Sequence, residues 1–397
     1  GGDAKQTTAL NQPKALPVID GKGYLYLSGV TGNYASVSDV TNLVGLGDFV
    51  MEVKDVYITD WAASGSDSLL SIYAAGGESF IFRRTNFSVQ CILLFSGSAP
   101  DSAPSFTHGL TGAATVSLRI IRSGAFITME MDTGAGYITM QTNPSTTETL
   151  AGTTGTLEIG SHGLGVDTTS FLGKIGRARI WDNGTASGTP VLDVDFTATN
   201  IRHGDTKFQC ATGQTVTINQ SGNDPATVIK KSVLRFDGAD DGLHGLFANN
   251  IDSGYMFAAF SVLGDGGENY GRIFSVNNTN SNDFSGTGVS FAMKDSSTAH
   301  TNLSSYYNST LNLKVDLFDD DNGDILHQAR IQSGQNLVSV NGDAAVTDSR
   351  DTSSVDSDTF NIGSNFGTGE NAAIDLEYLA LFPATISDAE AARVVTY

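Results

Sequence analysis

Three short segments of this chain recur in the same order at a nearly constant spacing. The separations between the copies are 209, 210 and 203 residues, so the copies stay in step while the segments between them drift. A period of about 200 residues is too long for a solenoid repeat and fits a whole domain. The sequence therefore predicts two copies of one unit. The matched pairs are Tyr26–Gly32 with Arg235–Asp241, Ile121–Gly124 with Ile331–Gly334, and Leu157–Ser161 with Phe360–Ser364.

Each copy is predicted to be built from β-strands. Ile127, Met129 and Met131 alternate with polar residues, which is typical of a strand with one buried face. The chain holds 45 Gly and 8 Pro, and turn clusters such as Asn341–Gly342 separate the alternating segments. Hydrophobic residues at 40% suffice for two cores in 397 residues. The fold class is therefore all-β, with two antiparallel β-sandwiches in tandem.

The domain limits follow from the duplication. Residues 1–18 are expected to form an extended N-terminal arm, because they hold two Pro and few large apolar residues. Residues 19–229 form the first sandwich, in which an alternating segment at about 190–229 has no counterpart in the second copy and supplies additional strands. Residues 230–397 form the second sandwich and end in a short helix. Ser387–Glu390 predicts the start of that helix, because Ser followed three residues later by Glu is a capping box.

The charge of the chain excludes some partners. The net charge is −21, with 13 basic and 20 acidic residues in 1–229 against 9 and 23 in 230–397. Such a surface repels phosphates, so neither nucleic acid nor an anionic membrane is an expected partner. No apolar run approaches the 18 residues of a membrane helix. Cys91 and Cys210 lie in apolar stretches and are expected to be buried thiols rather than a disulfide framework.

The order of the motifs resembles the laminin G-like, concanavalin A-like lectin/glucanase superfamily. Phe236–Asp241 matches the opening pattern Phe-Asp-Gly-x-Asp-Asp, and Leu27–Gly32 matches it in outline. Phe171–Ile180 and Ile374–Phe382 resemble the closing strand that follows an Ile-Gly pair. The resemblance covers most of the chain and implies tandem jelly-roll sandwiches, a fold that hosts many functions.

Tandem sandwiches of this kind also look similar to virion proteins of tailed bacteriophages, where head decoration and tail-associated proteins carry such domains. This similarity implies a virion surface location and other virion proteins of the capsid or tail as partners. It is also compatible with a homo-oligomer and with binding to glycans. The alternative is a secreted or cell-surface protein that binds carbohydrate like a lectin.

An enzymatic role is not expected. An enzyme of this superfamily would carry Glu-x-Asp-x-x-Glu on one strand, with the two Glu as nucleophile and acid/base. Glu130-Met131-Asp132 begins that pattern, but Ala135 stands where the second Glu belongs. Both acids are better interpreted as the solvent-facing side of a strand. We therefore expect no catalytic residue and no organic cofactor, and a glycosidase with unfamiliar catalytic groups is the third and weakest hypothesis.

Calcium is the inorganic ligand that the sequence leaves open. Closely spaced carboxylates repel one another and are relieved by a divalent cation with a preference for hard oxygen ligands. The favoured alternative is a solvated acidic turn, because Asp and Asn occur in turns without any metal. The candidate ligands are Asp237, Asp240 and Asp241 in one turn and Asp319, Asp321 and Asp324 in another.

Aromatic side chains offer candidate stacking platforms for a sugar, but the sequence assigns no glycan contact to any of them. The candidates in polar context are Trp61, Tyr34, Tyr137, Tyr270, Tyr306 and Tyr307, whereas Trp181 closes an alternating strand and is expected in the core.

Overall fold

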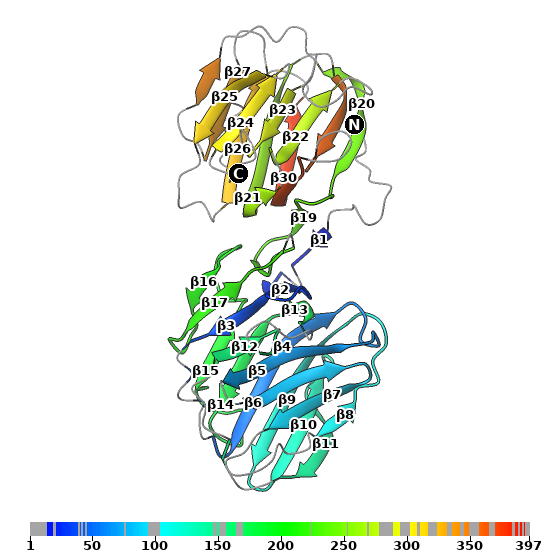
Figure 1. Ribbon diagram of the computed structural model, residues 1–397, viewed down its shortest axis with the longest axis vertical. Coiled ribbons are helices and arrows are strands. Elements are labelled where there is room, and N and C mark those ends of the chain that lie inside the picture. Colours follow the sequence, from blue (N-terminus) through cyan, green and yellow to red (C-terminus); the bar gives the residue numbers. More distant parts are fainter. Residues whose placement is uncertain are drawn as a thin grey trace. The chain divides into compact units, whose positions relative to one another are not determined.

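β-strands dominate the computed structural model, which is drawn in Figure 1. The contacts divide the chain into two compact units, one of Val18–Lys230 and one of Lys231–Tyr397 together with Gly1–Pro17. The structure describes residues 14–18, 21–38, 40, 43, 46–74, 77–93, 104–145, 149–150, 156–163, 170–222, 224–251, 253–267, 270–277, 289–293, 302–307, 310–316, 324–331, 336–341, 345–348, 357–364, 370–382, 386–387, 390 and 393.

The unit Val18–Lys230, the first sandwich below, contains two sheets. One follows the order β11-β10-β9-β4-β13-β2-β18, with β14 pairing with β4 and β15, and the other follows β16-β17-β3-β12-β5-β6-β7-β8. Its strands are β2 (Tyr24–Ser28), β3 (Tyr34–Val37), β4 (Phe49–Ile58), β5 (Ser66–Ala74), β6 (Gly77–Thr85), β7 (Ser88–Leu93), β8 (Ser105–Thr107), β9 (Ala114–Ser123), β10 (Phe126–Asp132), β11 (Ile138–Pro144), β12 (Thr156–Ile159), β13 (Leu172–Ile175), β14 (Arg177–Trp181), β15 (Leu192–Asp195), β16 (Lys207–Gln209), β17 (Thr215–Asn219) and β18 (Thr227–Ile229).

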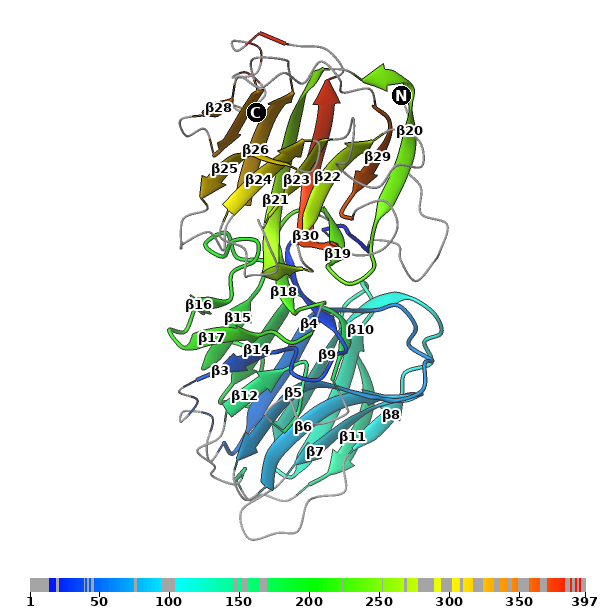
Figure 2. The ribbon, with the colours of Figure 1, turned by 45° about the horizontal axis from the view of Figure 1, so that its top comes forward.

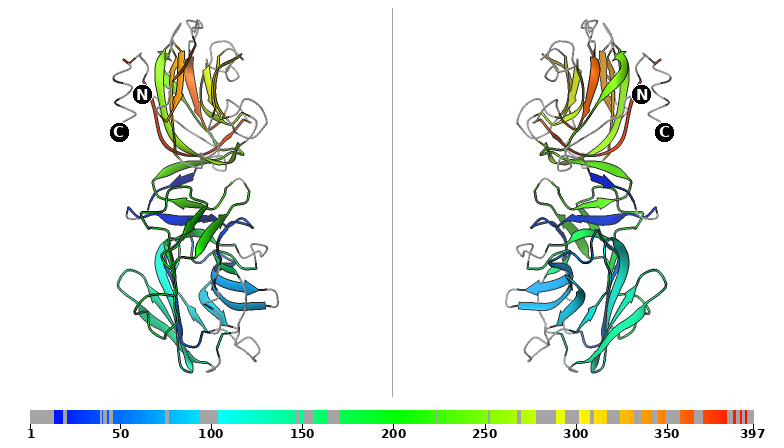
Figure 3. Two further views of the ribbon diagram at one scale, coloured as in Figure 1. Left: turned by 90° about the vertical axis from the view of Figure 1, so that its left-hand side faces the viewer. Right: turned by 90° about the vertical axis from the view of Figure 1, so that its right-hand side faces the viewer.

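The other unit, the second sandwich below, also contains two sheets, and Figure 3 gives a view along the edges of the layers. Their orders are β1-β19-β30-β21-β26-β27-β28 and β20-β29-β22-β23-β24-β25. The strands are β1 (Lys14–Leu16), β19 (Val233–Asp237), β20 (Leu243–Ile251), β21 (Gly254–Gly267), β22 (Arg272–Asn277), β23 (Val289–Ala292), β24 (Asn302–Tyr307), β25 (Thr310–Asp316), β26 (Asp324–Ile331), β27 (Asn336–Val340), β28 (Val346–Asp348), β29 (Ser357–Ile362) and β30 (Ala372–Phe382).

Each pair of sheets encloses its own core. In the first sandwich, Val53 and Leu118 of the nine-stranded sheet join Phe82 and Ile159 of the eight-stranded sheet in one cluster of buried side chains. The strand pairings within the described residues are antiparallel, in keeping with short connections between neighbouring strands. The predicted fold class, all-β with two antiparallel β-sandwiches in tandem, is confirmed.

The core of the second sandwich is built in the same way. Phe260 and Ile374 come from one sheet, and Phe274 and Phe360 come from the other. His327 is also fully buried and its ring lies 5.4 Å from that of Phe291, edge to face. Burial lowers the pKa of His327 to about 3, so this ring is neutral at physiological pH.

Several local predictions are confirmed. Ile127, Met129 and Met131 are buried in β10, while the residues between them are partly exposed. Cys91 and Cys210 are free, buried thiols. Ser387 and Glu390 form the reciprocal bonds of a capping box, because the Ser387 backbone N–H donates to Glu390 Oε2 at 2.9 Å and the Glu390 N–H donates to Ser387 Oγ at 3.3 Å.

The sequence does not predict where two short edge strands pair, namely β1, which is labelled in Figure 1, and β18, which is labelled in Figure 2. β1 precedes the first sandwich in the chain but pairs with β19 of the second, placing Leu16 opposite Val233. β18 directly precedes β19 but pairs with β2 of the first sandwich, placing Ile229 opposite Tyr24. The arm predicted over residues 1–18 thus contributes a strand to the second unit. In the part of the chain that the structure describes, no helix has the length and apolar character needed to cross a membrane.

Candidate functional site

The acidic turn after β19 requires a glycine at position 238. Gly238 adopts a φ of +76°, and a Cβ added there would lie 2.8 Å from the Cβ of Ala373 and 2.9 Å from the Cα of Gly267. Asp237 Oδ1 accepts the backbone N–H of Ala239 at 2.9 Å. The turn therefore has a fixed path between β19 and the neighbouring strands.

This turn brings three predicted ligands together. One carboxylate oxygen from each of Asp237, Asp240 and Asp241 lies within 4.8 Å of the others. Asp240 is exposed, Asp237 is half-buried and Asp241 is buried, with Asp241 Oδ2 accepting the backbone N–H of Asp237 at 3.0 Å. The acidic turn, which we define as these three residues, offers the hard oxygen donors that calcium prefers.

The electrostatics of the acidic turn are unfavourable for three charges. Burial, followed by the negative charges of Asp237 and Asp240, raises the pKa of Asp241 to about 7, although the charge of Lys14 opposes the shift. Either a proton or a divalent cation would relieve this repulsion. Calcium binding at this turn stays a prediction.

The second predicted acidic cluster, Asp319, Asp321 and Asp324, lies largely outside the described residues. Asp319 and Asp321 lie outside the described residues, and Asp324 is the first residue of β26 with a side chain that also lies outside them. Calcium at this cluster likewise stays a prediction.

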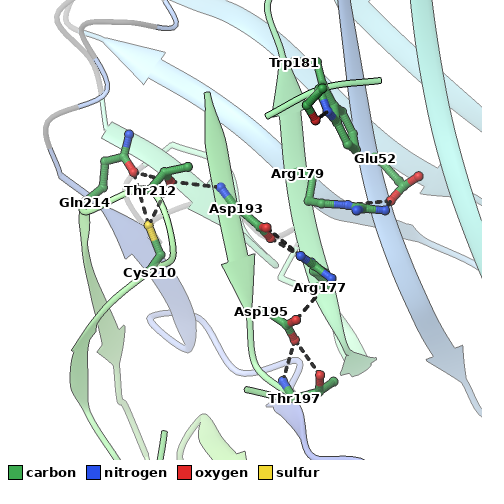
Figure 4. Close-up of polar contacts among 11 residues, drawn as sticks. Glu52, Arg177, Arg179, Trp181, Asp193, Asp195, Thr197, Cys210, Thr212 and Gln214 are labelled. Carbon is green, nitrogen blue, oxygen red and sulfur yellow. Dashed lines mark hydrogen bonds and ion pairs between the residues drawn. The ribbon is translucent and has the colours of Figure 1, made fainter. Parts of the chain in front are cut away.

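Polar side chains also form a network on the first sandwich, over β4, β14 and β15 (Figure 4). Arg177 donates from Nε to Asp193 Oδ1 at 2.7 Å and lies 3.2 Å from Asp195 Oδ2 through Nη1. Asp195 Oδ1 also accepts the backbone N–H and the hydroxyl of Thr197, at 2.9 and 2.6 Å. The hydrogen bonds with Asp193 raise the pKa of Arg177, so this arginine is held as a paired cation.

Arg179 makes the second half of the network. Its Nε donates to Glu52 Oε1 at 3.0 Å, and its guanidinium lies 4.7 Å from the ring centre of Trp181. Glu52 is nearly fully buried, and its charge is met by this pairing. The charged groups of this network are thus engaged with one another and hold neighbouring strands together.

The residues that begin the glucanase-like pattern are engaged as well. Glu130 forms an ion pair with Arg119 on the neighbouring strand β9. Asp132 Oδ1 accepts the backbone N–H groups of Gly134 and Gly136 at 2.7 and 2.9 Å, which closes the turn after β10. The Arg119 guanidinium in turn lies 3.9 Å from the ring centre of Tyr137. Neither acid is arranged as a free member of a catalytic pair.

The described aromatic candidates differ in exposure, and Tyr34, Tyr137 and Tyr270 are half-buried. Trp61 is fully buried and donates from Nε1 to the carbonyl of Ala114 at 3.0 Å, so its ring is not available for stacking on a sugar. Trp181 is buried, as expected. Tyr306 and Tyr307 belong to β24, and their side chains lie outside the described residues.

Sequence reasoning missed the network of Figure 4. The alternation of Arg177, Arg179 and Trp181 with apolar residues was a usable signal for a polar outer face. The partners could not be found from it, because Glu52 lies more than a hundred residues away and faces Arg179 only through the pairing of β4 with β14.

No protein-family model and no curated protein sequence matches the chain. Among the solved structures similar to it, domains LG4-5 of the mouse laminin alpha1 chain share 10% identity at a TM-score of 0.36, covering 96% of this chain and 92% of that chain. CBM40 of the Ruminococcus gnavus IT-sialidase, bound to alpha2,3 sialyllactose, shares 12% at a TM-score of 0.31, covering 42% and 92%. The enzymatically active domain of bacteriophage CBA120 tailspike protein 2 shares 13% at a TM-score of 0.32, covering 45% and 28%. These likenesses concern the fold alone.

Proposed function

We propose that this chain is a non-enzymatic surface protein of a bacteriophage virion, a head decoration or tail-associated component with a capacity for glycan binding. The observation that carries the non-enzymatic part of the proposal is the pairing of charges on the outer face of the nine-stranded sheet. Glu52, Glu130 and Asp193 each meet an arginine from a neighbouring strand. Such cross-strand pairs stiffen a sheet and engage these three carboxylates, which disfavours a role for them in proton transfer.

The duplication and the charge support a role in display. Two sandwiches in one chain double the surface that a particle can present. A net charge of −21 keeps copies apart in solution and disfavours adhesion to nucleic acid. Both properties suit a protein that coats a particle.

The virion role is tested by quantitative mass spectrometry of gradient-purified particles. We expect this polypeptide in a fixed ratio to the major capsid or tail protein, and in the same ratio after a high-salt wash. Its absence from purified particles would refute the virion role.

The non-enzymatic role is tested separately with a panel of polysaccharides. We expect no release of reducing ends by the parent chain or by Glu130→Gln. Turnover by the parent that is lost in Glu130→Gln would make Glu130 a catalytic acid and overturn this part of the proposal.

The second candidate function is that of a secreted or cell-surface carbohydrate-binding protein, and the acidic turn is the observation that favours it. A cation held by Asp237, Asp240 and Asp241 would offer open coordination positions to sugar hydroxyls. A glycan array with and without chelator tests this function, with Asp240→Asn as the site variant. Asp60→Asn is the matched control, because Asp60 lies in an exposed turn of the first sandwich, where its side chain accepts the backbone N–H of Ala62 at 3.0 Å. Absence of binding in both conditions would exclude this function.

A further inference from the structure

The two short edge strands occupy equivalent places in the two sandwiches. Opposite β19, the residues of β1 pair in the order Leu16 with Val233, Ala15 with Leu234 and Lys14 with Arg235. Opposite β2, the residues of β18 pair in the order Ile229 with Tyr24, Val228 with Leu25 and Thr227 with Tyr26. The strands run in the same direction with the same register, so each sandwich has the same kind of acceptor edge.

Chain connectivity makes the two acceptor edges differ. β18 belongs to the same continuous unit, Val18–Lys230, as the edge that it covers. β1 is joined to the second sandwich only through the whole of the first, because residues 18–230 separate it from β19. β1 can therefore leave its edge without any other strand of the second sandwich moving.

The strand β1 is short. It comprises three paired residues, of which Leu16 is buried while Lys14 and Ala15 are exposed. Pro17 follows directly and restricts the backbone at the hinge, holding Leu16 in the extended region. Short, stiff hinges favour exchange of an element between identical chains, since the contacts in the exchanged form are the same.

The edge that β1 covers is an acceptor for an extended segment. β19 without β1 would present unpaired backbone groups along Val233–Arg235, with the acidic turn at its far end. The charge of Lys14 reaches Asp241, so the segment that fits this edge is extended, carries a basic residue and places an apolar residue beside Val233. Residues 14–16 of any copy of this chain meet these requirements.

We propose that β19 is a strand-acceptor site whose partner is residues 14–16 of a second copy, so that this chain self-associates by exchanging its N-terminal strand. The pairing within one chain is then the closed form, and pairing between chains is the open form with the same register. Formation of the open form rises with chain concentration, whereas the closed form does not depend on it.

Disulfide trapping at the pair Ala15 and Leu234 tests the proposal. Two single variants of the full chain, Ala15→Cys and Leu234→Cys, are mixed at equal amounts, incubated over a range of concentrations, oxidised and separated without reductant. Exchange predicts a covalent heterodimer whose share rises several-fold over a tenfold increase in concentration. The double variant should give cross-linked monomer at low concentration and cross-linked dimer at high concentration.

The matched control is the double variant Val228→Cys with Leu25→Cys, which occupies the same register position on β18 and β2. Its cross-link should stay within one chain at every concentration, because both strands belong to one unit. The parent chain measures the background from the buried thiols Cys91 and Cys210.

A mixture that yields no heterodimer at any concentration, together with a double variant that cross-links only within one chain, would overturn the proposal. Light scattering of the parent and of a chain starting at residue 18 guards against a folding defect of the cysteine variants. Association that is concentration-dependent in the parent and absent from the shortened chain supports exchange, and association that persists without residues 1–17 contradicts it.

Discussion

The turn after β2 in the first sandwich and the turn after β19 in the second share a glycine conformation and differ in the chemistry of their side chains. Gly29 and Gly238 adopt φ values of +77° and +76° at this turn. In the first sandwich a neutral amide closes it, since Asn33 Nδ2 donates to Ser28 Oγ at 2.7 Å and to the Asp224 carbonyl at 2.9 Å. In the second sandwich carboxylates close the turn, since Asp241 Oδ2 accepts the Asp237 N–H and Asp237 Oδ1 accepts the Ala239 N–H. The duplicated fold therefore fixes the path of the chain and leaves the charge of the turn free to differ.

The neighbouring edge positions differ in the same way. Lys174 lies opposite Tyr26 in the first sandwich, and its ammonium lies 4.5 Å from the ring centre of Tyr24. Arg235 lies opposite Asp375 in the second, where both side chains are fully buried and are joined by bonds of 2.8 and 2.7 Å. The second copy thus concentrates charge where the first uses aromatic contacts.

Breaking this ion pair should have the largest effect. Asp375→Ala leaves the guanidinium of Arg235 buried without its carboxylate, and we expect the second sandwich to lose about 3–5 kcal/mol of unfolding free energy. Lys174→Ala, the matched change in the first sandwich, removes cation–π contacts and should cost about 0.5–2 kcal/mol. Denaturant unfolding followed by hydrogen-exchange mass spectrometry reports each sandwich separately. Equal losses of unfolding free energy in the two variants would contradict the expected difference between the two sandwiches.

The buried His327 should make the second sandwich sensitive to acid. The unfolded chain protonates this histidine near pH 6.5, whereas burial lowers the pKa in the folded state to about 3. The unfolded state therefore binds more protons between these values, and stability falls as the pH drops below about 6.5. At pH 4 the loss should be about 3 kcal/mol relative to pH 7. Unfolding curves of His327→Leu should lack this loss, and an unchanged acid profile would contradict the assignment.

Asp241 should act in the opposite direction. Its pKa is raised to about 7 in the folded state, so the folded protein binds more protons than the unfolded chain between about pH 4 and 7. Stability is then greatest at the acid end and is lost as the pH rises through 7. We expect a loss on the order of 1–2 kcal/mol between pH 5 and 8, after allowance for solvent screening.

Asp241→Asn isolates the contribution of Asp241 from that of His327, because an amide oxygen can still accept the Asp237 N–H. The variant should be more stable than the parent at pH 8, by a smaller margin at pH 5, and nearly equal to it below about pH 4. A variant less stable than the parent at pH 8 would show that the repulsion within the acidic turn has been overestimated.

Calcium should give the smallest change in unfolding free energy, and that change should be confined to the second sandwich. At millimolar calcium, a site of extracellular affinity stabilises the folded state by about 1 kcal/mol. The gain should appear in the second sandwich at pH 8, shrink at pH 5 as Asp241 takes up a proton, and vanish in Asp237→Asn. Thermal unfolding with calcium and with chelator measures it. A gain that survives Asp237→Asn would place calcium elsewhere.

Much of the fold could be predicted because its signals are local. The alternation in β10 and the capping box of Ser387 and Glu390 each depend on residues a few positions apart. The acidic turn was also within reach, since Asp237, Asp240 and Asp241 are neighbours in the sequence.

The remaining features depend on which strands become neighbours. The pairing of Lys14–Leu16 with β19 joins residues more than two hundred positions apart, so no local pattern around these three residues reveals which strand they will pair with. Arg235 and Asp375 likewise show no local sign of becoming a buried pair. The burial of Trp61 was missed because the polar residues around it indicate a loop, while the ring itself packs inward.

The placement of β1 has a mechanical consequence. A load applied to the N-terminal end of this chain reaches the three residue pairs on β19 before it reaches any strand of the first sandwich. These few backbone bonds would yield at low force, so β1 would leave β19 first. A protein tethered by this end would thus stretch reversibly before either core is disturbed.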